Sequence, residues 1–290
     1  MGVCTGVCWG GVTDVNMRFA QLSKEEKGIL ARLKAWLALQ LAAEAFRGDA
    51  GLRKMCPAGG VSLKLAMWGA GGGAGVRGAT AAGRGAGRRR EGTEMQFVVK
   101  NGIARVCSGG WPQVVLIFPG AASAVRVLSG NTGAVVPVPL GLGAFKALAF
   151  FRKATGRATE LLYAAETPEI VRARLLLAAT LHGLEIVASD SYLVRRMQII
   201  PDGVVAVRAS EIEYFVEKRG NAIHVIEAVK SADAVLSFAD SRSAIDVLSG
   251  KRQAVVALGS GEVRIEGLLP LVQGLFAVLD RLSWYLGVSL

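Results

Sequence analysis

The sequence predicts an α+β fold made of two similar units, each with strands in one layer and helices on one face of that layer. Three observations support this prediction. A stretch of 17 residues occurs twice, short alternating apolar segments flank it in both copies, and an apolar helix closes each copy. Because a sheet and an amphipathic helix each bury one face, packing one on the other is the expected way to cover both.

The repeated stretch occupies residues 114–130 and returns 120 residues later at 234–250, with nine identical positions. Each copy reads as a short apolar strand that ends in phenylalanine, a turn of small and polar residues, and a short amphipathic helix that ends in Ser-Gly. Gly130 and Gly250 are expected at positive φ after these helices, since glycine has no Cβ to clash there. The chain therefore contains an internal duplication.

Segments upstream of the repeat define the two units. Residues 31–55 align with residues 173–197 at an offset of 142, whereas the repeated stretch is offset by 120. The difference places an insertion of 22 residues in the first copy, and the Gly/Arg-rich tract at 68–94 accounts for it. We expect a first unit over 23–163, interrupted by this tract, and a second unit over 164–290.

Local patterns place the elements of each unit. Ser23 and Glu26 form a capping box at the start of a helix over 23–46, and Thr167 is expected to cap the matching helix with Pro168 in its first turn. Asn101-Gly102 predicts a hairpin. We expect strands over 61–66, 96–99, 104–107, 114–118 and 134–138 in the first unit; strands over 204–209, 214–217, 222–227, 234–238, 254–258 and within 259–267 in the second; and closing helices over 142–155 and 268–285.

Two segments fall outside this pattern. Residues 1–22 have no counterpart in the second unit and are expected to be a disordered extension. The tract at 68–94 has too few large apolar residues to form a core and is also expected to be disordered. It carries +3 of the formal net charge of +11. It could be a basic arm that contacts nucleic acid or an anionic membrane, although a tolerated expansion is the simpler interpretation.

Composition indicates a cytoplasmic protein rather than a membrane-embedded or secreted one. Apolar residues make up 52% of the chain, but no window of eighteen residues is free of both charge and proline. The four cysteines, Cys4, Cys8, Cys56 and Cys107, have no cysteine counterparts in the second unit, so no disulfide framework is expected. Cys4 and Cys8 lack the second pair that a structural zinc site needs, so no metal site is expected.

No catalytic constellation is present in the sequence. His182 and His224 are the only histidines, and neither has a serine or cysteine neighbour in a recognisable nucleophile setting. The glycines between 69 and 75 do not follow the strand-to-helix pattern of a phosphate-binding loop. We therefore expect a protein that is not an enzyme and that needs no cofactor.

Residues 232–279 carry a resemblance to the sterol carrier protein 2 (SCP2-like) family. The elements that match are Asp233 before a strand, Asp240 in the turn, Gly250-Lys251 after the helix, and Gly261 to Gly267 in a G-x-V-x-I-x-G strand followed by an apolar helix. The first unit resembles a diverged copy that lacks the leading aspartate and this last strand. The resemblance implies two SCP2-like domains, each a mixed sheet of about five strands covered on one face by helices.

The resemblance also implies non-catalytic binding or carriage of a sterol, fatty acyl or acyl-CoA-like ligand in an apolar tunnel. Enclosing about sixteen methylenes would contribute about 13 kcal/mol gross, which requires a continuous apolar wall. The richest apolar stretches supply the candidate lining residues; an ordinary filled core is the alternative for each of them. These candidates are Phe118, Leu128, Phe145, Leu148 and Phe151 in the first unit, and Phe238, Leu248, Leu268, Leu271 and Leu275 in the second.

The expected partner is therefore a hydrophobic small molecule or lipid. The diffuse positive charge also allows a transient contact with an anionic membrane, and nucleic acid is the less favoured partner. The alternative function is an interaction module that uses the Gly/Arg-rich tract to contact nucleic acid or an anionic membrane surface. The sequence leaves the oligomeric state open.

Overall fold

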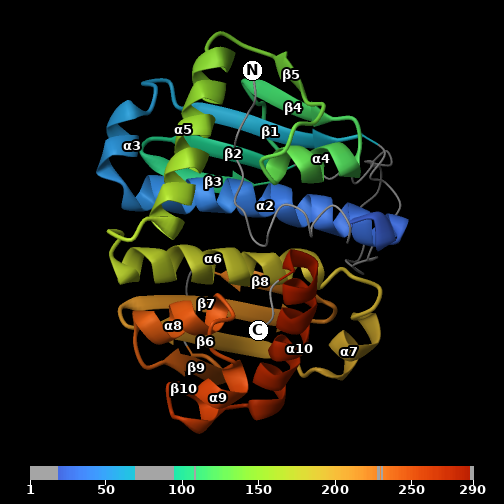
Figure 1. Cartoon of the computed structure of the whole chain (residues 1–290), viewed down its shortest axis with the longest axis vertical. Helices are drawn as coiled ribbons and strands as arrows, with labels where there is room; N and C mark the ends of the chain where they lie inside the picture. Colours follow the sequence, from blue (N-terminus) through green and yellow to red (C-terminus); the bar gives the residue numbers. More distant parts are fainter. Residues whose placement is uncertain (1–18, 69–94, 108, 227–228, 230, 288–290) are drawn as a thin grey trace, which may run out of the picture.

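The structure is a computed structural model, which describes residues 19–68, 95–107, 109–226, 229 and 231–287. Two five-stranded mixed sheets lie at opposite ends of the long axis of the molecule, and helices α2 (Lys24–Gly48) and α6 (Glu169–Val187) lie side by side between them (Figure 1). Each sheet packs against helices, so the predicted α+β fold class is confirmed. Residues 1–18 of the expected extension and 69–94 of the expected insertion lie outside the described residues.

The two sheets have the same order of strands. In the first sheet the order is β3 (Ile103–Cys107), β2 (Met95–Lys100), β1 (Val61–Met67), β4 (Val114–Phe118) and β5 (Val136–Pro139). In the second it is β8 (Ala222–Ile226), β7 (Ile212–Arg219), β6 (Gly203–Ala209), β9 (Ala234–Phe238) and β10 (Val263–Gly267).

Strand registers also correspond between the sheets. β1 and β4 are parallel in the first sheet, and β6 and β9 are parallel in the second. The other strand pairs of both sheets are antiparallel. Met67 lies opposite Phe118 in the first sheet, and Ala209 lies opposite Phe238 in the second. Each copy of the repeated stretch therefore occupies the same place in its own sheet.

Helices cover one face of each sheet. In the first unit these are α2, α4 (Ala121–Leu128) and α5 (Ala144–Tyr163), and in the second they are α6, α8 (Ser241–Leu248) and α10 (Leu269–Leu286) (Figure 1). Gly130 follows α4 at a φ of 83°, and Gly250 follows α8 at a φ of 73°, as predicted. Short helices α3 (Ala50–Met55) and α7 (Val194–Ile199) precede the first strand of each sheet.

The two central helices are buried nearly all round, because each one packs on its own unit and on the other helix. Side chains link the units along this contact. Trp36 of α2 packs edge-on against His182 of α6, with ring centroids 6.3 Å apart. The Ser191 hydroxyl donates a hydrogen bond to Glu25, at 3.2 Å. A helix with two apolar faces is therefore the expected result of joining the units at this position.

Helix starts agree with the sequence in one unit and differ in the other. Ser23 and Glu26 form the predicted capping box of α2. Thr167 was predicted to cap α6, but Pro168 is the N-cap residue and no side chain caps the helix. Phe19 and Leu22, within the extension expected to be disordered, pack against the core ahead of α2.

The predicted strand over 254–258 is wrong: this segment forms helix α9 (Ala254–Gly259). The reason lies in the sheet. β10 pairs with β9 at the edge that β5 holds in the first unit, so the 254–259 segment has no strand partner there. Its backbone groups are instead paired within a helix, which satisfies them locally. The predicted strand within 259–267 is present as β10.

The predicted hairpins are confirmed. Asn101 at a φ of 52° and Gly102 at a φ of 74° turn the chain between β2 and β3, and Gly220 at a φ of 56° turns it between β7 and β8. Among the helices of the described residues, none combines the length and the apolar character that crossing a bilayer requires.

Candidate ligand-binding cavity

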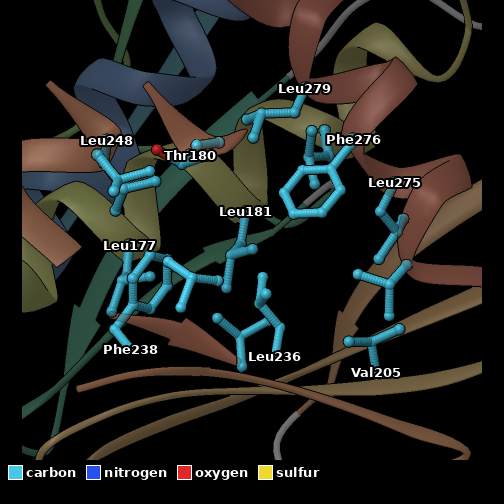
Figure 2. A pocket seen from close by; sticks show the side chains of 16 residues that line it. Leu177, Thr180, Leu181, Val205, Leu236, Phe238, Leu248, Leu275, Phe276 and Leu279 are labelled. Carbon is cyan, nitrogen blue, oxygen red and sulfur yellow. The ribbon is translucent and has the colours of Figure 1, made fainter. Parts of the chain in front are cut away.

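An apolar cavity of about 50 Å³ lies in the second unit, between the sheet and the helices that cover it. Figure 2 shows the side chains around it, which come from the central helix α6, the closing helix α10, the short helices α8 and α9 (Ala254–Gly259), and the sheet. The lining residues are Leu177, Thr180, Leu181, Leu184, Val205, Val207, Leu236, Phe238, Val247, Leu248, Ala254, Val263, Val272, Leu275, Phe276 and Leu279.

Helical and strand periodicity explain why these residues converge. Leu177, Thr180, Leu181 and Leu184 recur on α6 with the spacing of one helix face, and Val272, Leu275, Phe276 and Leu279 repeat that spacing on α10. On the strands, Val205 with Val207 and Leu236 with Phe238 alternate, so each pair points to the same side of the sheet. The faces of α6 and α10 and one face of the sheet therefore form most of the wall, and Val247 and Leu248 of α8 and Ala254 of α9 complete it.

The chemistry of the lining is hydrocarbon. Thr180 is the one lining residue with a polar side chain, and no lining residue is charged. A cavity of this kind attracts apolar molecules and offers water few hydrogen-bond partners. Leu236, Ala254, Phe276 and Leu279 are the lining residues that are only partly buried. Three of these four belong to α9 and α10, so we infer that the mouth of the cavity lies between these two helices.

Three of the five candidates from the second unit line the cavity, and two do not. Phe238, Leu248 and Leu275 line the cavity. Leu271 is fully buried but packs beside Gly203 and does not line it. Leu268 does not line the cavity either, because it lies before the first turn of α10 and is 37% exposed.

In the first unit, four of the five predicted residues lie in or against the core. Phe118, Leu128 and Phe151 are buried, and Leu148 is partly buried against the core. Phe151 packs against Phe97 with ring centroids 5.7 Å apart, and Phe150 packs against Phe46 at 5.9 Å. The prediction for Phe145 as an interior wall residue is wrong: its side chain is 80% exposed at the first turn of α5.

Sequence reasoning missed the contribution of α6 to the lining. The sequence shows that the run from Leu175 to Leu184 is almost entirely apolar with no polar face, but it does not show which side of the helix faces the sheet. We read that run as one side of a helix covering a sheet. It also serves the contact with α2, and the cavity uses the side that faces its own sheet.

Polar groups elsewhere in the second unit form ion pairs and hydrogen bonds that hold the units together. Arg281 of α10 donates to Asp190 at 2.6 Å and to Glu26 of α2 at 2.7 Å, and its guanidinium lies 3.9 Å from the centre of the Trp284 ring. Burial and the nearby charge of Asp190 raise the pKa of Tyr285, which donates to Asp190 at 2.9 Å. This arrangement ties α10 to the central helices.

The described residues contain no group of histidine, cysteine and acidic side chains that could hold a metal ion. His182 pairs through Nδ1 with Glu185 at 2.9 Å, and Glu185 accepts from the backbone N–H of Val225, so the pair is engaged in packing α6 on β8. Burial raises the pKa of the Cys56 thiol. The expected absence of a cofactor remains a prediction.

Comparison with known proteins gives partial structural similarity. No protein-family model matches the chain, and no curated protein matches it. A solved structure described as "UbiJ-SCP2 Ubiquinone synthesis protein" has 18% identity and a TM-score of 0.29, covering 34% of this chain and 82% of its own. The sterol carrier protein domain 2 of Helicoverpa armigera has 17% identity and a TM-score of 0.30, covering 38% of this chain and 89% of its own. Structures with SCP2 domains are thus among those similar to part of this chain.

Proposed function

We propose that this protein is a non-catalytic binder or carrier of a lipid-like molecule, built from two duplicated units. The observation that supports it is the hydrocarbon-lined cavity beneath α10 in the second unit. Its lining has no charged side chain, and its one hydroxyl, that of Thr180, has no histidine or acidic lining residue beside it to act as a base, so apolar burial is the only interaction that it offers in quantity.

The size of the cavity indicates how a ligand would enter. An apolar cavity three times as large, about 150 Å³, is known to hold a benzene ring, so 50 Å³ is too small for an acyl or sterol body. Binding therefore requires α10 and the side chains at the mouth to move. Phe276 and Leu279 are the partly buried side chains between the cavity and solvent, and they are the ones whose displacement would extend the space.

The test is the binding of a fluorescent fatty acid, cis-parinaric acid, to the full-length chain in solution. We expect its emission to rise on binding, with one site per chain. Ala254→Trp places a bulky ring at the mouth and should lower the affinity at least about ten-fold, which corresponds to the loss of about two buried methylenes.

The matched control is Ala134→Trp, at the position in the first unit that corresponds to Ala254 by the offset of the repeat. Ala134 is exposed next to β5 and does not line the cavity. This variant should bind like the unmodified chain. Equal affinities for all three proteins, or no binding by the unmodified chain, would contradict the proposal. Native mass spectrometry of the purified chain provides an independent check for a retained apolar molecule.

A further inference from the structure

A corner of the first sheet presents large apolar side chains to solvent. Trp111 is 83% exposed, Leu142 is 102% exposed and Phe145 is 80% exposed, and Leu140 is also exposed. We call these four residues the apolar corner. Side chains of this size are normally buried, and a group of them at one place on a surface indicates a binding surface.

Backbone contacts bring the apolar corner together. β4 begins where β5 ends, and Leu140 donates from its N–H to the carbonyl of Gln113 at 2.9 Å, which fixes the loop after β5 beside the loop before β4. The Ser62 hydroxyl donates to the carbonyl of Trp111 at 3.4 Å. Helix α5 begins at Ala144, directly after this loop, so Phe145 lies at the same corner.

The charge around the apolar corner has one sign. The described residues between 50 and 159 include ten lysines and arginines and no aspartate or glutamate. The corresponding described residues of the second unit, between 192 and 287, include ten of each sign. Lys146 is exposed next to Phe145, and Lys100 is exposed at the same end of the sheet, opposite Ile103. Residues 50–159 of the first unit are therefore complementary to a negatively charged partner. Asp49 and Glu160, on either side of this range, both pair with Arg157.

The edge strand beside the apolar corner, β5, cannot pair with an added strand. In β5 the N–H groups of alternate residues point to β4, as the bond from Leu140 shows, and Pro137 and Pro139 occupy the outward-facing positions between them. Proline has no N–H to donate, so strand addition at this edge would lack its hydrogen bonds. The occupant of the corner is not a pairing strand from a second copy.

We propose that the apolar corner of the first unit docks on an anionic lipid bilayer. Tryptophan, phenylalanine and leucine side chains enter the interfacial region of a bilayer, and lysines at its surface are attracted to anionic headgroups. Phosphates of a nucleic acid would match the lysines but not the exposed Leu142 and Phe145. This surface is separate from the cavity, so docking does not depend on ligand binding.

Co-sedimentation of the full-length chain with vesicles tests the proposal. Phosphatidylcholine vesicles that contain phosphatidylserine should bind the chain, and vesicles of phosphatidylcholine alone should bind it about ten-fold less. The double substitution L142S/F145S should lower partitioning about ten-fold, since it removes two inserting side chains. Lys146→Glu should lower it by a further, salt-dependent factor of about five.

The control is V255S/V256S, which removes two exposed apolar side chains from α9 in the second unit. It should bind vesicles like the unmodified chain. Equal loss in both double variants, or no preference for anionic vesicles, would overturn the proposal. Binding of a homopolymeric RNA would also overturn the proposal, if the RNA competes with vesicles and if L142S/F145S leaves RNA binding unchanged. Cis-parinaric acid binding, measured without vesicles, should be unchanged in L142S/F145S and reduced in Ala254→Trp, so failure of one proposal is distinguishable from failure of the other.

Discussion

The two units share a strand order but fill the space between sheet and helices differently. In the first unit, Phe46 and Phe97 occupy positions where the second unit has Ala188 and Val216. These two phenylalanines pack against Phe150 and Phe151 of α5, respectively. The helix positions change in the opposite sense: Leu177, Thr180 and Leu184 of α6 correspond to alanines in α2.

The two units therefore carry their large side chains on different layers. The first unit places large side chains on the sheet and on α5, where two aromatic pairs occupy the interior. The second places its bulk on α6 and α10, and the two faces leave a cavity between them. Interiors of proteins are normally packed close to crystal density, so a retained cavity is a feature that selection for stability alone would remove.

The largest expected effect is at Phe97, whose side chain is fully buried between the sheet and α5. Phe97→Ala should lower the free energy of unfolding by about 4 kcal/mol, because it removes the transfer energy of a ring and leaves a void. Urea denaturation followed by circular dichroism measures this. Val216→Ala, at the corresponding position of β7, should cost clearly less. Equal losses would mean that the two interiors are packed alike.

The next effect concerns Arg281, which has no equivalent contact in the first unit because Gly48 stands where the second unit has Asp190. Arg281→Ala would leave the buried Asp190 carboxylate without its cation, at a cost of about 3 kcal/mol. It would also release α10 from Glu26 of α2. We expect lower unfolding stability and faster proteolysis within the second unit.

Arg242 provides the control for this prediction, since it forms ion pairs with Glu169 and Asp246 on an exposed surface. Arg242→Ala should leave the urea midpoint unchanged, because exposed ion pairs are screened by solvent. A similar loss for both arginines would show that charge, rather than the buried contact between units, sets the effect of Arg281.

Sequence patterns predicted the fold better than the cavity, for a physical reason. Alternation, the turn at Asn101-Gly102 and the capping box at Ser23 are local signals, and such signals gave the strands that form both sheets, their hairpins and the start of α2. The predicted cap of α6 at Thr167 was wrong. The repeat wrongly predicted a strand over 254–258. Whether a Val-rich segment is extended depends on a partner strand, and that strand lies elsewhere in the chain. Phe145 and Leu268 were misplaced because apolar spacing cannot show which side of a helix start remains in solvent.

Three of the cavity residues, Phe238, Leu248 and Leu275, could be predicted from their elements, whereas the α6 face could not. Helix α6 is apolar on two sides, and only the packing of α2 on one of them reveals which side faces the sheet. The cavity volume is the small difference between the space between the layers and the volume of the side chains that fill it. It therefore cannot be predicted without a structure.

The smallest expected effect is a dependence on pH at a third difference between the units. Lys218 of β7 is buried where the first unit has Val99, and it pairs with Asp202 at 2.7 Å where the first unit has Gly60. The hydrogen bond from Lys218 holds the pKa of the Asp202 carboxyl below its usual range. The pair therefore stabilises the fold above the unfolded-state pKa of Asp202, about 3.9, and this contribution is lost as pH falls through the lower, folded-state pKa.

Because Asp202 is 60% exposed, solvent screening should keep the contribution of the pair below about 1 kcal/mol. The difference in unfolding free energy between the unmodified chain and Asp202→Asn should shrink as the pH is lowered from about 5 to below 3.9. In a Lys218→Met background, this pH-dependent difference should be smaller, because the largest cause of the lowered pKa is gone while the Gly220 N–H and Arg219 remain. A difference between the unmodified chain and Asp202→Asn that stays constant with pH would mean that neither Lys218 nor the Gly220 N–H, which donates to Asp202 at 2.9 Å, lowers the pKa of this carboxyl in the folded state. The buried lysine would then be held mainly by the carbonyl of Ile200, to which it also donates.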